Sequence, residues 1–312
     1  MVDFRNRNIV LLLVVVVLFI IGFLVNDPFL LFEQSYGRSP LLLKDVAEED
    51  VRRIVVINKD ERRVFTRTSS GWLLEYGGNN YNADSKKIAE NLKKLLDIRR
   101  YQKVSSSKDK FQELEVADDN FHIILEGENS KVLARLQLGK AASNYTSTLV
   151  RRFGEDDVYS AKGSLRSDWN QEVDAYREKT LLLVARPNIK EVVISGKSSF
   201  KLAQLGETGW QLSYGKKDVP ADKNRVESFL NQLSELKGYR FYKEKSPPLA
   251  YKVVLQLQGN LTKELSIYGP LKEGEYVASS TDNPFLLTIS KYQVENYLTK
   301  PEEFEQKNPG SP

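Results

Sequence analysis

The chain has 312 residues, more than one ordinary domain needs, and its 41% apolar and 28% charged residues fit a folded globular protein. The net charge is +4 with basic and acidic residues interspersed, which argues against a nucleic-acid-binding surface, where positive charge clusters. The sequence has no cysteine, which excludes disulfides and cysteine nucleophiles, and one histidine, His122, which excludes a multi-histidine metal site within one chain.

An uninterrupted apolar run occupies residues 9–25, IVLLLVVVVLFIIGFLV. A helix of this length extends about 25 Å, close to the thickness of a bilayer's hydrocarbon core, and the run has no polar face. The run predicts a single-pass membrane helix. A cleaved signal peptide is the alternative, although no small-residue cleavage site follows. Arg5 and Arg7 lie before the run, which predicts a cytoplasmic tail at residues 1–8 and an extracytoplasmic location for all that follows the helix.

The remainder of the chain resembles itself at an offset of 138 residues. Residues 51–101 and 189–239 align without a gap and share 12 identities. The matched positions are Gly71 with Gly209, Trp72 with Trp210, Tyr76 with Tyr214, Asp84 with Asp222, Tyr101 with Tyr239, and, by similarity, Val64 with Leu202. A looser similarity joins the segments that follow, FHIILEG from Phe121 and YKVVLQLQG from Tyr251. The sequence therefore predicts two tandem, similar units.

Each unit begins with three short β-branched or alternating runs, which predict an antiparallel meander ending in the Gly-Trp strand. Asp84 and Asp222 then stand where a helix N-cap belongs, before apolar residues at helical spacing. More strands and a short closing helix follow in each unit. Runs of strands with segregated helices predict an α+β fold with antiparallel sheets and one amphipathic helix in each unit.

The pattern sets the expected domain boundaries. They are a tail at residues 1–8, a membrane helix at 9–25, a linker at 26–40, unit 1 at 41–178, unit 2 at 179–300 and a flexible tail at 301–312. The last segment is assigned as a tail because it is rich in Lys, Glu, Gly and Pro.

Several segments together resemble the DUF4340 family. They are LLLKDVAEEDVRRIVVINKD after the membrane segment, the Gly-Trp pair in a strand, YNAD before the amphipathic helix and VDAYREKTLLLV at the end of unit 1. The resemblance implies a bacterial membrane-anchored protein of unassigned activity, often encoded beside subunits of ABC-2-type and gliding-associated transporters. It carries over no catalytic residues.

Four groups of residues imitate functional motifs, and each favours a structural interpretation. Residues 105–108 have a Ser-x-x-Lys spacing but lie in a predicted loop, and residues 196–198 lack the first glycine of a phosphate-binding loop. His122 lies alone in a predicted strand. The acidic clusters at 118–119 and 155–157 lack the spacing of a calcium loop. We therefore predict no catalytic residue, no metal site and no cofactor.

The shared aromatic residues have two interpretations. They could form a ligand platform, but positions that recur in both units are explained more simply as structural anchors. We assign that role to Gly71, Trp72, Tyr76, Asp84, Tyr101, Gly209, Trp210, Tyr214, Asp222 and Tyr239. The unshared residues 79–81 and 217–219 are expected at turn tips, where each unit could carry its own recognition.

The expected function follows from the anchor, the duplicated body and the lack of a catalytic motif. It is a noncatalytic accessory protein in the bacterial inner membrane, whose extracytoplasmic units bind other membrane or envelope proteins, with ABC transporter subunits implied by the resemblance. One alternative is an extracytoplasmic ligand- or glycan-binding module with a concave pocket and exposed aromatic residues. A hydrolase whose carboxylates meet only in space is the other.

Overall fold

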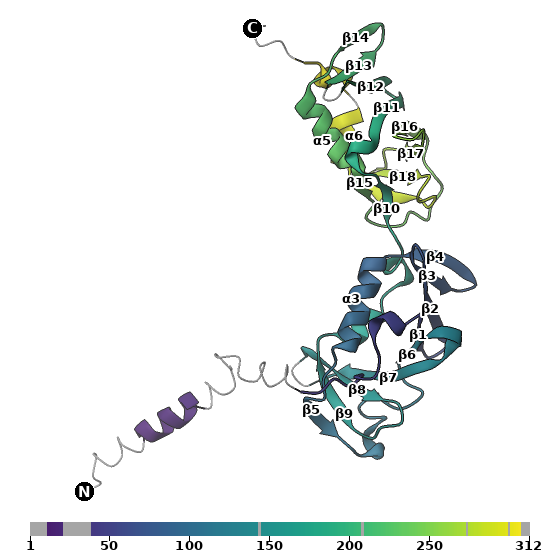
Figure 1. The fold of residues 1–312 in the computed structure, drawn as a ribbon. Helices are drawn as coiled ribbons and strands as arrows, with labels where there is room; N and C mark the ends of the chain where they lie inside the picture. The colour runs from purple at the N-terminus through teal and green to yellow at the C-terminus, as the bar shows by residue number, and fades with distance from the viewer. Residues whose placement is uncertain are drawn as a thin grey trace. The chain divides into compact units, whose positions relative to one another are not determined.

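Two compact units make up the computed structural model, which describes residues 11–20, 39–142, 145–206, 209–272, 274–298 and 300–306. Unit 1 spans Met1–Arg177 and unit 2 spans Glu178–Pro312. Each unit has its own sheet and helices (Figure 1). Both combine antiparallel strands with few helices, which confirms the prediction of an α+β fold with antiparallel sheets.

The N-terminal part that the structure describes is a helix at residues 11–20 with exposed side chains. The other residues of the predicted membrane span, 9–25, lie outside the described residues. Among the described residues, no helix has both the length and the apolar character required to cross a membrane.

Unit 1 is built on one antiparallel sheet. Its strands are β1 (Arg53–Asn58), β2 (Glu61–Thr68), β3 (Gly71–Tyr76), β4 (Asn79–Ala83), β5 (Gln102–Ser105), β6 (His122–Glu126), β7 (Val132–Ala141), β8 (Ser147–Arg152) and β9 (Val158–Lys162). In the described part of the unit they follow the order β4-β3-β2-β1-β6-β7-β8-β9-β5. Strands β4 and β5 are therefore the two edges.

Helix α3 (Ser85–Leu96) covers the core face of this sheet. It begins at Asp84, whose side chain accepts the backbone N–H of Lys87 at 3.1 Å and so satisfies one of the free donors of the first turn. Its apolar face is buried among the strands through Ile88, Leu92 and Leu95. The short helix α4 (Leu165–Trp169) adds Trp169, whose ring packs edge to face on Phe65 at 5.7 Å. Short 3-10 helices occupy Glu48–Asp50, Lys108–Lys110, Glu128–Ser130 and Val173–Ala175.

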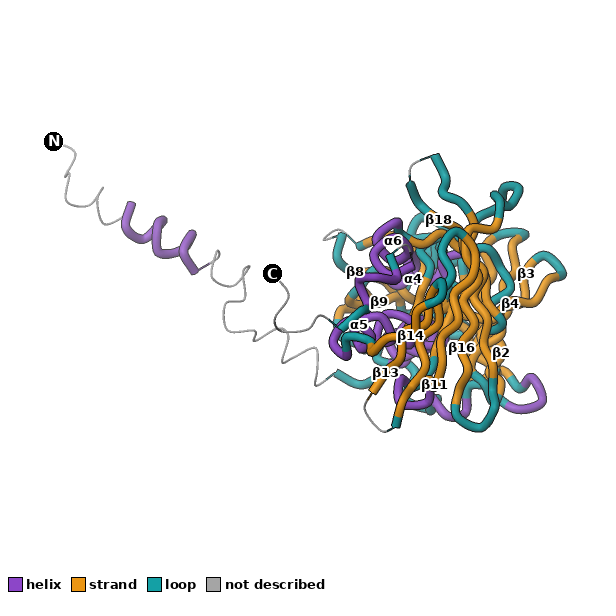
Figure 2. The backbone as a smooth tube through the Cα atoms, turned by 90° about the horizontal axis from the view of Figure 1, so that it is seen from above, coloured by secondary structure: helices purple, strands orange, loops and turns teal. Residues whose placement is uncertain are grey.

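Unit 2 has a large sheet and a separate strand pair. Its strands are β10 (Thr180–Leu183), β11 (Ile189–Gly196), β12 (Phe200–Leu205), β13 (Gly209–Tyr214), β14 (Lys217–Pro220), β15 (Glu235–Lys237), β16 (Leu249–Leu257), β17 (Thr262–Tyr268), β18 (Tyr276–Ser280) and β19 (Leu287–Ile289). The described strands of the large sheet follow the order β14-β13-β12-β11-β16-β17-β18-β19, and β10 pairs with β15. Helices α5 (Lys223–Ser234) and α6 (Lys291–Leu298) lie on one side of this sheet (Figure 2).

The C-terminal segment contributes to the core of unit 2 instead of forming a tail from residue 301. Pro301–Phe304 is a 3-10 helix, as is Arg186–Asn188 earlier in the unit. The Phe304 side chain is completely buried, and its ring lies 5.5 Å from the rings of both Phe200 and Phe229. The prediction of a flexible tail is therefore wrong for the described residues 301–306, because two buried apolar side chains among the charged ones tie this segment to the core.

The predicted turn tips are also placed differently. Residues 79–81 and 217–219 lie in the edge strands β4 and β14. The first hairpin turns at Gly77 and Gly78, which have positive φ values of 56° and 78°, and the second at Gly215 and Lys216. Two-residue turns of this kind reverse the chain early, so the residues that follow already pair with the preceding strand.

The two large sheets share the order of eight strands, from β4 to β9 and from β14 to β19. The predicted match of Val64 with Leu202 is nevertheless wrong. Val64 pairs with Val55 and lies outside the main core cluster of unit 1, whereas Leu202 belongs to the core of unit 2. A shift of one residue moves a side chain to the other face of a strand.

The strand registers explain this mismatch. Trp72 pairs with Arg67, whereas Trp210 pairs with Gln204, although the gapless alignment places Arg67 on Leu205. The connection before β12 is one residue shorter than the one before β2, and the connection after β12 is one residue longer. The two changes cancel, so the sequence alignment needs no gap.

Candidate functional site

The Gly-Trp pair of unit 1 lies where strand β3 begins beside the start of helix α3. We call Arg67, Gly71, Trp72 and Ser85 corner 1. Trp72 is 6% exposed, and the guanidinium carbon of Arg67 lies 4.9 Å from the centre of its ring. The backbone N–H of Trp72 donates to Ser85 Oγ at 3.0 Å. A Cβ on Gly71 would collide with the Ser85 side chain, so corner 1 is closed between strand and helix.

The Gly-Trp pair of unit 2 has different neighbours. We call Gln204, Gly209, Trp210 and Lys223 corner 2, in which Gln204 takes the register position of Arg67 and Lys223 the helix position of Ser85. Trp210 is half-buried, with part of its side chain against the core. The three atoms nearest to a Cβ on Gly209 all belong to Leu205, so the start of α5 does not approach it as Ser85 approaches Gly71.

A pocket of about 540 Å³ opens at corner 2. Its wall includes Leu205, Trp210, Asp218, Lys223, Asn224 and Gln306. This volume lies within the usual range for small-molecule sites, about 300–1,000 Å³. The sequence comparison assigned Trp210 the same structural role as Trp72. The sequences do differ at one position beside the Gly-Trp pair, where unit 1 has Ser85 and unit 2 has Lys223. The alignment does not show that the first residue of the helix contacts the Gly-Trp strand, so this difference could not be recognised as important from the sequence.

The other shared residues divide into caps, hairpin residues and surface residues. Asp222 caps α5 by accepting the N–H of Arg225 at 2.8 Å, as Asp84 caps α3. Tyr76 donates to Glu61 at 3.3 Å, and Tyr214 donates to Glu305. The Tyr214 hydrogen bond is the largest cause that holds the pKa of Glu305 below its usual value. Tyr101 and Tyr239 are 36% and 58% exposed, so they are not core anchors.

The residues that imitate catalytic motifs make structural contacts. Ser106 donates to Asp157 at 2.7 Å, whereas Lys108 pairs with Asp156 at 3.4 Å. Gly196 ends β11, and Ser198 donates to the carbonyl of Leu298 at the end of α6. In the described part of the chain, no three His, Cys, Asp or Glu side chains are grouped as a metal site would require.

His122 is 7% exposed on β6, and its Nδ1 lies 2.7 Å from the carbonyl oxygen of Asn120. Burial lowers the pKa of His122, because the charged imidazolium would lose its hydration. The positive charge of Arg135 acts in the same direction, whereas Asp118 opposes it. His122 therefore favours its neutral form in the folded protein.

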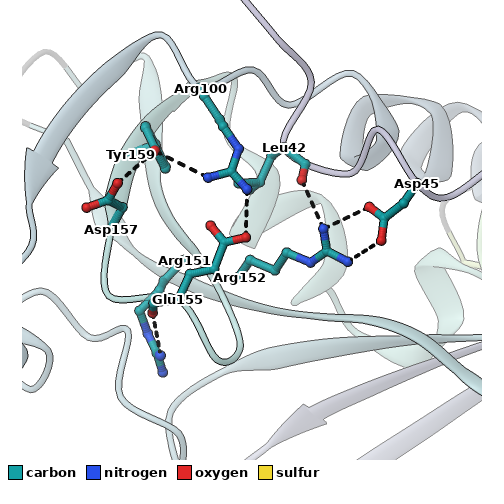
Figure 3. Close-up of polar contacts among 8 residues, drawn as sticks. All are labelled: Leu42, Asp45, Arg100, Arg151, Arg152, Glu155, Asp157 and Tyr159. Carbon is teal, nitrogen blue, oxygen red and sulfur yellow. Dashed lines mark hydrogen bonds and ion pairs between the residues drawn. The ribbon is translucent and has the colours of Figure 1, made fainter.

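A further cluster of polar contacts ties Leu42 and Asp45 to the rest of unit 1 (Figure 3). The Asp45 carboxylate accepts two hydrogen bonds from Arg152, at 2.8 and 2.6 Å, and these bonds are the largest cause that lowers the pKa of Asp45. Arg152 also donates to the Leu42 carbonyl at 3.4 Å. Beside this pair, Arg100 donates to Glu155 at 2.6 Å, which raises the pKa of Arg100.

Backbone hydrogen bonds hold the same segment. Leu42 N–H donates to the Ile98 carbonyl at 2.7 Å, and Arg100 N–H donates to the Pro40 carbonyl at 2.9 Å. Leu42 and Leu43 are completely or almost completely buried. We call residues 39–46 with these contacts the junction. It fixes the chain to unit 1 directly before the edge strand β5, and no sequence motif marked Asp45 or Arg152.

Comparisons with known proteins identify the family and nothing closer. No curated protein and no solved structure matches the chain. A family sequence model, described as a domain of unknown function (DUF4340), matches residues 72–254. The match covers more than half of the chain, from strand β3 in unit 1 to strand β16 in unit 2. The chain therefore belongs to the DUF4340 family.

Proposed function

We propose that the protein is a noncatalytic accessory subunit anchored in the bacterial inner membrane by residues 9–25. Its tail at residues 1–8 would then be cytoplasmic and both units extracytoplasmic. The apolar run and the basic residues before it support this orientation. The partners would be membrane or envelope proteins, among which ABC-type transporter subunits fit the family resemblance.

The observation that carries this proposal is the junction. A membrane helix ending at residue 25 would be followed by residues 26–38, and an extended chain of that length reaches at most about 45 Å. The junction then holds residue 39 onward against unit 1 through the Asp45–Arg152 pair and two backbone hydrogen bonds. Unit 1 would therefore stay within reach of other proteins in the same membrane.

Strand β5 is the surface we assign to the partner. It is an edge of the sheet, it follows Arg100, whose backbone N–H donates to Pro40 in the junction, and Val104 on it is 44% exposed. An edge strand can add an extended segment of another protein through backbone hydrogen bonds. We propose that such a segment of an integral membrane protein pairs with β5.

The two units would be tandem copies of one fold. The 12 identities across the gapless alignment and the common order of eight strands support this origin. Duplication would supply a second unit whose surfaces are free to diverge, as the two corners do.

Site-specific crosslinking in native membranes tests the partner. A photoreactive residue at Val104 of the full chain, expressed at its natural level, is expected to form an adduct with an integral membrane protein. The same residue at Val132, which is 58% exposed on β7, is the matched control and is expected to form none. The absence of an adduct from Val104, or the same adduct from both positions, would contradict the proposal.

Alkaline extraction tests the anchor separately. The full chain is expected to remain in the membrane fraction, and a chain without residues 9–25 is expected in the soluble fraction. Release of the full chain would overturn the membrane assignment while leaving the β5 partner open to the crosslinking test.

A ligand- or glycan-binding module is the second candidate, favoured by one observation, the pocket beside Trp210. Both functions could belong to one protein, because the pocket lies in unit 2 and β5 in unit 1.

A further inference from the structure

The pocket at corner 2 exists because two contacts that close corner 1 are replaced. In corner 1, Arg67 covers the exposed side of the Trp72 ring and Ser85 bonds to the Trp72 backbone. In corner 2, the side chain across the hairpin is Gln204, whose Oε1 accepts a hydrogen bond from Lys190 Nζ at 3.0 Å. Trp210 thereby remains half-buried, with part of its surface in the pocket wall.

The polar groups of the pocket include both donors and acceptors. Lys223 is a donor, and the side-chain amides of Asn224 and Gln306 can act as either. Asp218 and Gln211 also line the pocket, but they alternate along β14 and β13 with Val219 and Trp210, so their side chains lie on the other face of this hairpin. Asp222 also lines the pocket, with one carboxylate oxygen engaged by the N–H of Arg225. A ligand that carries several hydroxyl groups can use such a mixed set, because each hydroxyl both donates and accepts.

The charges exclude other simple ligands. Among the described lining residues on the Trp210 face, one carboxylate, Asp222, stands beside one ammonium group, Lys223, so the wall offers no net charge to attract an anion or a cation. A compact cation could stack on the Trp210 ring, but Lys223 in the same wall would repel it. A neutral ligand with polar edges and one apolar face fits the aromatic wall and the polar groups together.

We propose that this pocket binds one sugar ring of a neutral saccharide, with a C–H face of the ring against Trp210 and its hydroxyls on Asn224 and Lys223. The inference goes beyond the partner-binding function and gives a ligand class to the second candidate function. It assigns the site to unit 2 alone, because Arg67 and Ser85 occupy the corresponding space in unit 1.

The test measures saccharide binding to the full chain in detergent, by saturation-transfer NMR and calorimetry. The probes are maltotriose, cellotriose and chitotriose, with choline and inorganic phosphate as the cationic and anionic alternatives. At least one trisaccharide is expected to bind with a dissociation constant of about 1 mM or lower. Trp210→Ala is expected to weaken that binding about tenfold or more, since a buried aromatic contact often dominates a small interface.

A second variant keeps Trp210 and closes the pocket. Gln204→Arg with Lys223→Ser places the corner 1 side chains in unit 2, and this variant is expected to lose saccharide binding while unit 2 remains folded. Gln256→Arg with Lys252→Ser makes the same changes on β16, away from the pocket, and is expected to bind as the natural chain does.

Three outcomes would overturn the inference. The first is that no trisaccharide binds at a ligand concentration about ten times the expected dissociation constant. The second is that both pocket variants bind the trisaccharide as the natural chain does. The third is that choline or phosphate binds in place of the trisaccharide. None of them would alter the crosslink from Val104, so failure of the saccharide site is distinguishable from failure of the partner-binding proposal.

Discussion

Corners 1 and 2 share a Gly-Trp pair but differ in the side chains around it. In corner 1 the Trp72 ring is 6% exposed beneath Arg67, and Ser85 joins the strand to the helix. In corner 2 the ring of Trp210 is half-buried beside a pocket of about 540 Å³. A residue that recurs in two units can therefore have a structural role in one and remain available to a ligand in the other. The neighbours decide the outcome, and they belong to the unshared part of the sequence.

Replacing each tryptophan by alanine is expected to give the largest difference between the units. Trp72→Ala removes a buried side chain from the core of unit 1 and should lower its free energy of unfolding by about 3–5 kcal/mol. Trp210→Ala should cost unit 2 less than half as much, because its side chain is only partly in the core. Hydrogen exchange of the strand amides measures each unit separately in the full chain. Equal costs would show that corner 2 is as closed as corner 1.

The paired glycines provide the next contrast. Gly71 has a φ of 134°, a conformation that disfavours other residues, and a Cβ there would meet Ser85. Gly71→Ala is expected to destabilise unit 1 by about 1–3 kcal/mol. Gly209 does not have a positive φ, and its Cβ would approach only the Leu205 carbonyl closely, at 2.9 Å, so Gly209→Ala should cost less.

A double variant separates the cost of the unfavourable φ at residue 71 from the cost of the collision with Ser85. Ser85→Ala in the Gly71→Ala background removes the collision but leaves the unfavourable φ. Recovery of part of the lost stability, measured by the same hydrogen exchange, supports a closed corner 1. Full recovery would show that the backbone conformation contributes nothing. Ser85→Ala alone measures the cost of losing the Trp72 N–H bond to Ser85, and no recovery beyond that cost would show that Ser85 does not fill the corner.

The junction separates the units in another way. Asp45 holds Arg152 in unit 1, whereas the residue 138 positions later, in unit 2, is Leu183, which is 64% exposed. Asp45→Ala should destabilise the junction by about 1 kcal/mol, a modest value because the pair is partly exposed to solvent. Hydrogen exchange at Leu42 and Arg100 reports the loss, and Leu183→Ala is the control without effect there.

The stability that the Asp45–Arg152 ion pair gives to the junction should depend on pH in one direction. Arg152 lowers the pKa of Asp45, so the folded protein favours the carboxylate. The stabilisation is present above the usual pKa of about 3.8 and is lost as the pH falls through the lowered value. Asp45→Ala should remove this acid sensitivity of the junction. An unchanged acid profile would mean that the ion pair does not hold the segment.

Local signals in the sequence predicted the local elements. Asp84 and Asp222 marked the helix starts because capping involves residues three apart, and β-branched runs marked β1 and β11. The one-residue displacement of β12 could not be predicted, because two compensating loop changes leave the alignment without a gap. The strand Gln102–Ser105 was missed because its four residues show no apolar alternation.

The candidate sites were harder to predict than the fold. The pocket at corner 2 is lined by a hairpin, a helix start and Gln306, which are far apart in the sequence. The junction depends on Asp45 meeting Arg152, more than one hundred residues later. The polar composition around Phe304 indicates a tail, although the Phe304 side chain is completely buried. Each of these features is a tertiary contact between groups that show no motif individually.

The smallest expected effect concerns His122, for which the loosely aligned residue of unit 2 is Lys252, in an ion pair with Glu264 at 2.9 Å. Burial lowers the pKa of His122, so below about pH 6.5 the unfolded chain binds a proton that the folded unit 1 resists. The stability of unit 1 should therefore fall as the pH decreases from about 6.5 toward the lowered pKa, and His122→Gln should reduce that slope. Hydrogen exchange at pH 7.5 and 5.5 measures the slope in each unit. An identical slope for unit 1 in the His122→Gln variant would mean that the imidazole titrates freely in the folded protein. A change in the slope of unit 2 in the same variant would show that the stability of unit 2 is not independent of His122.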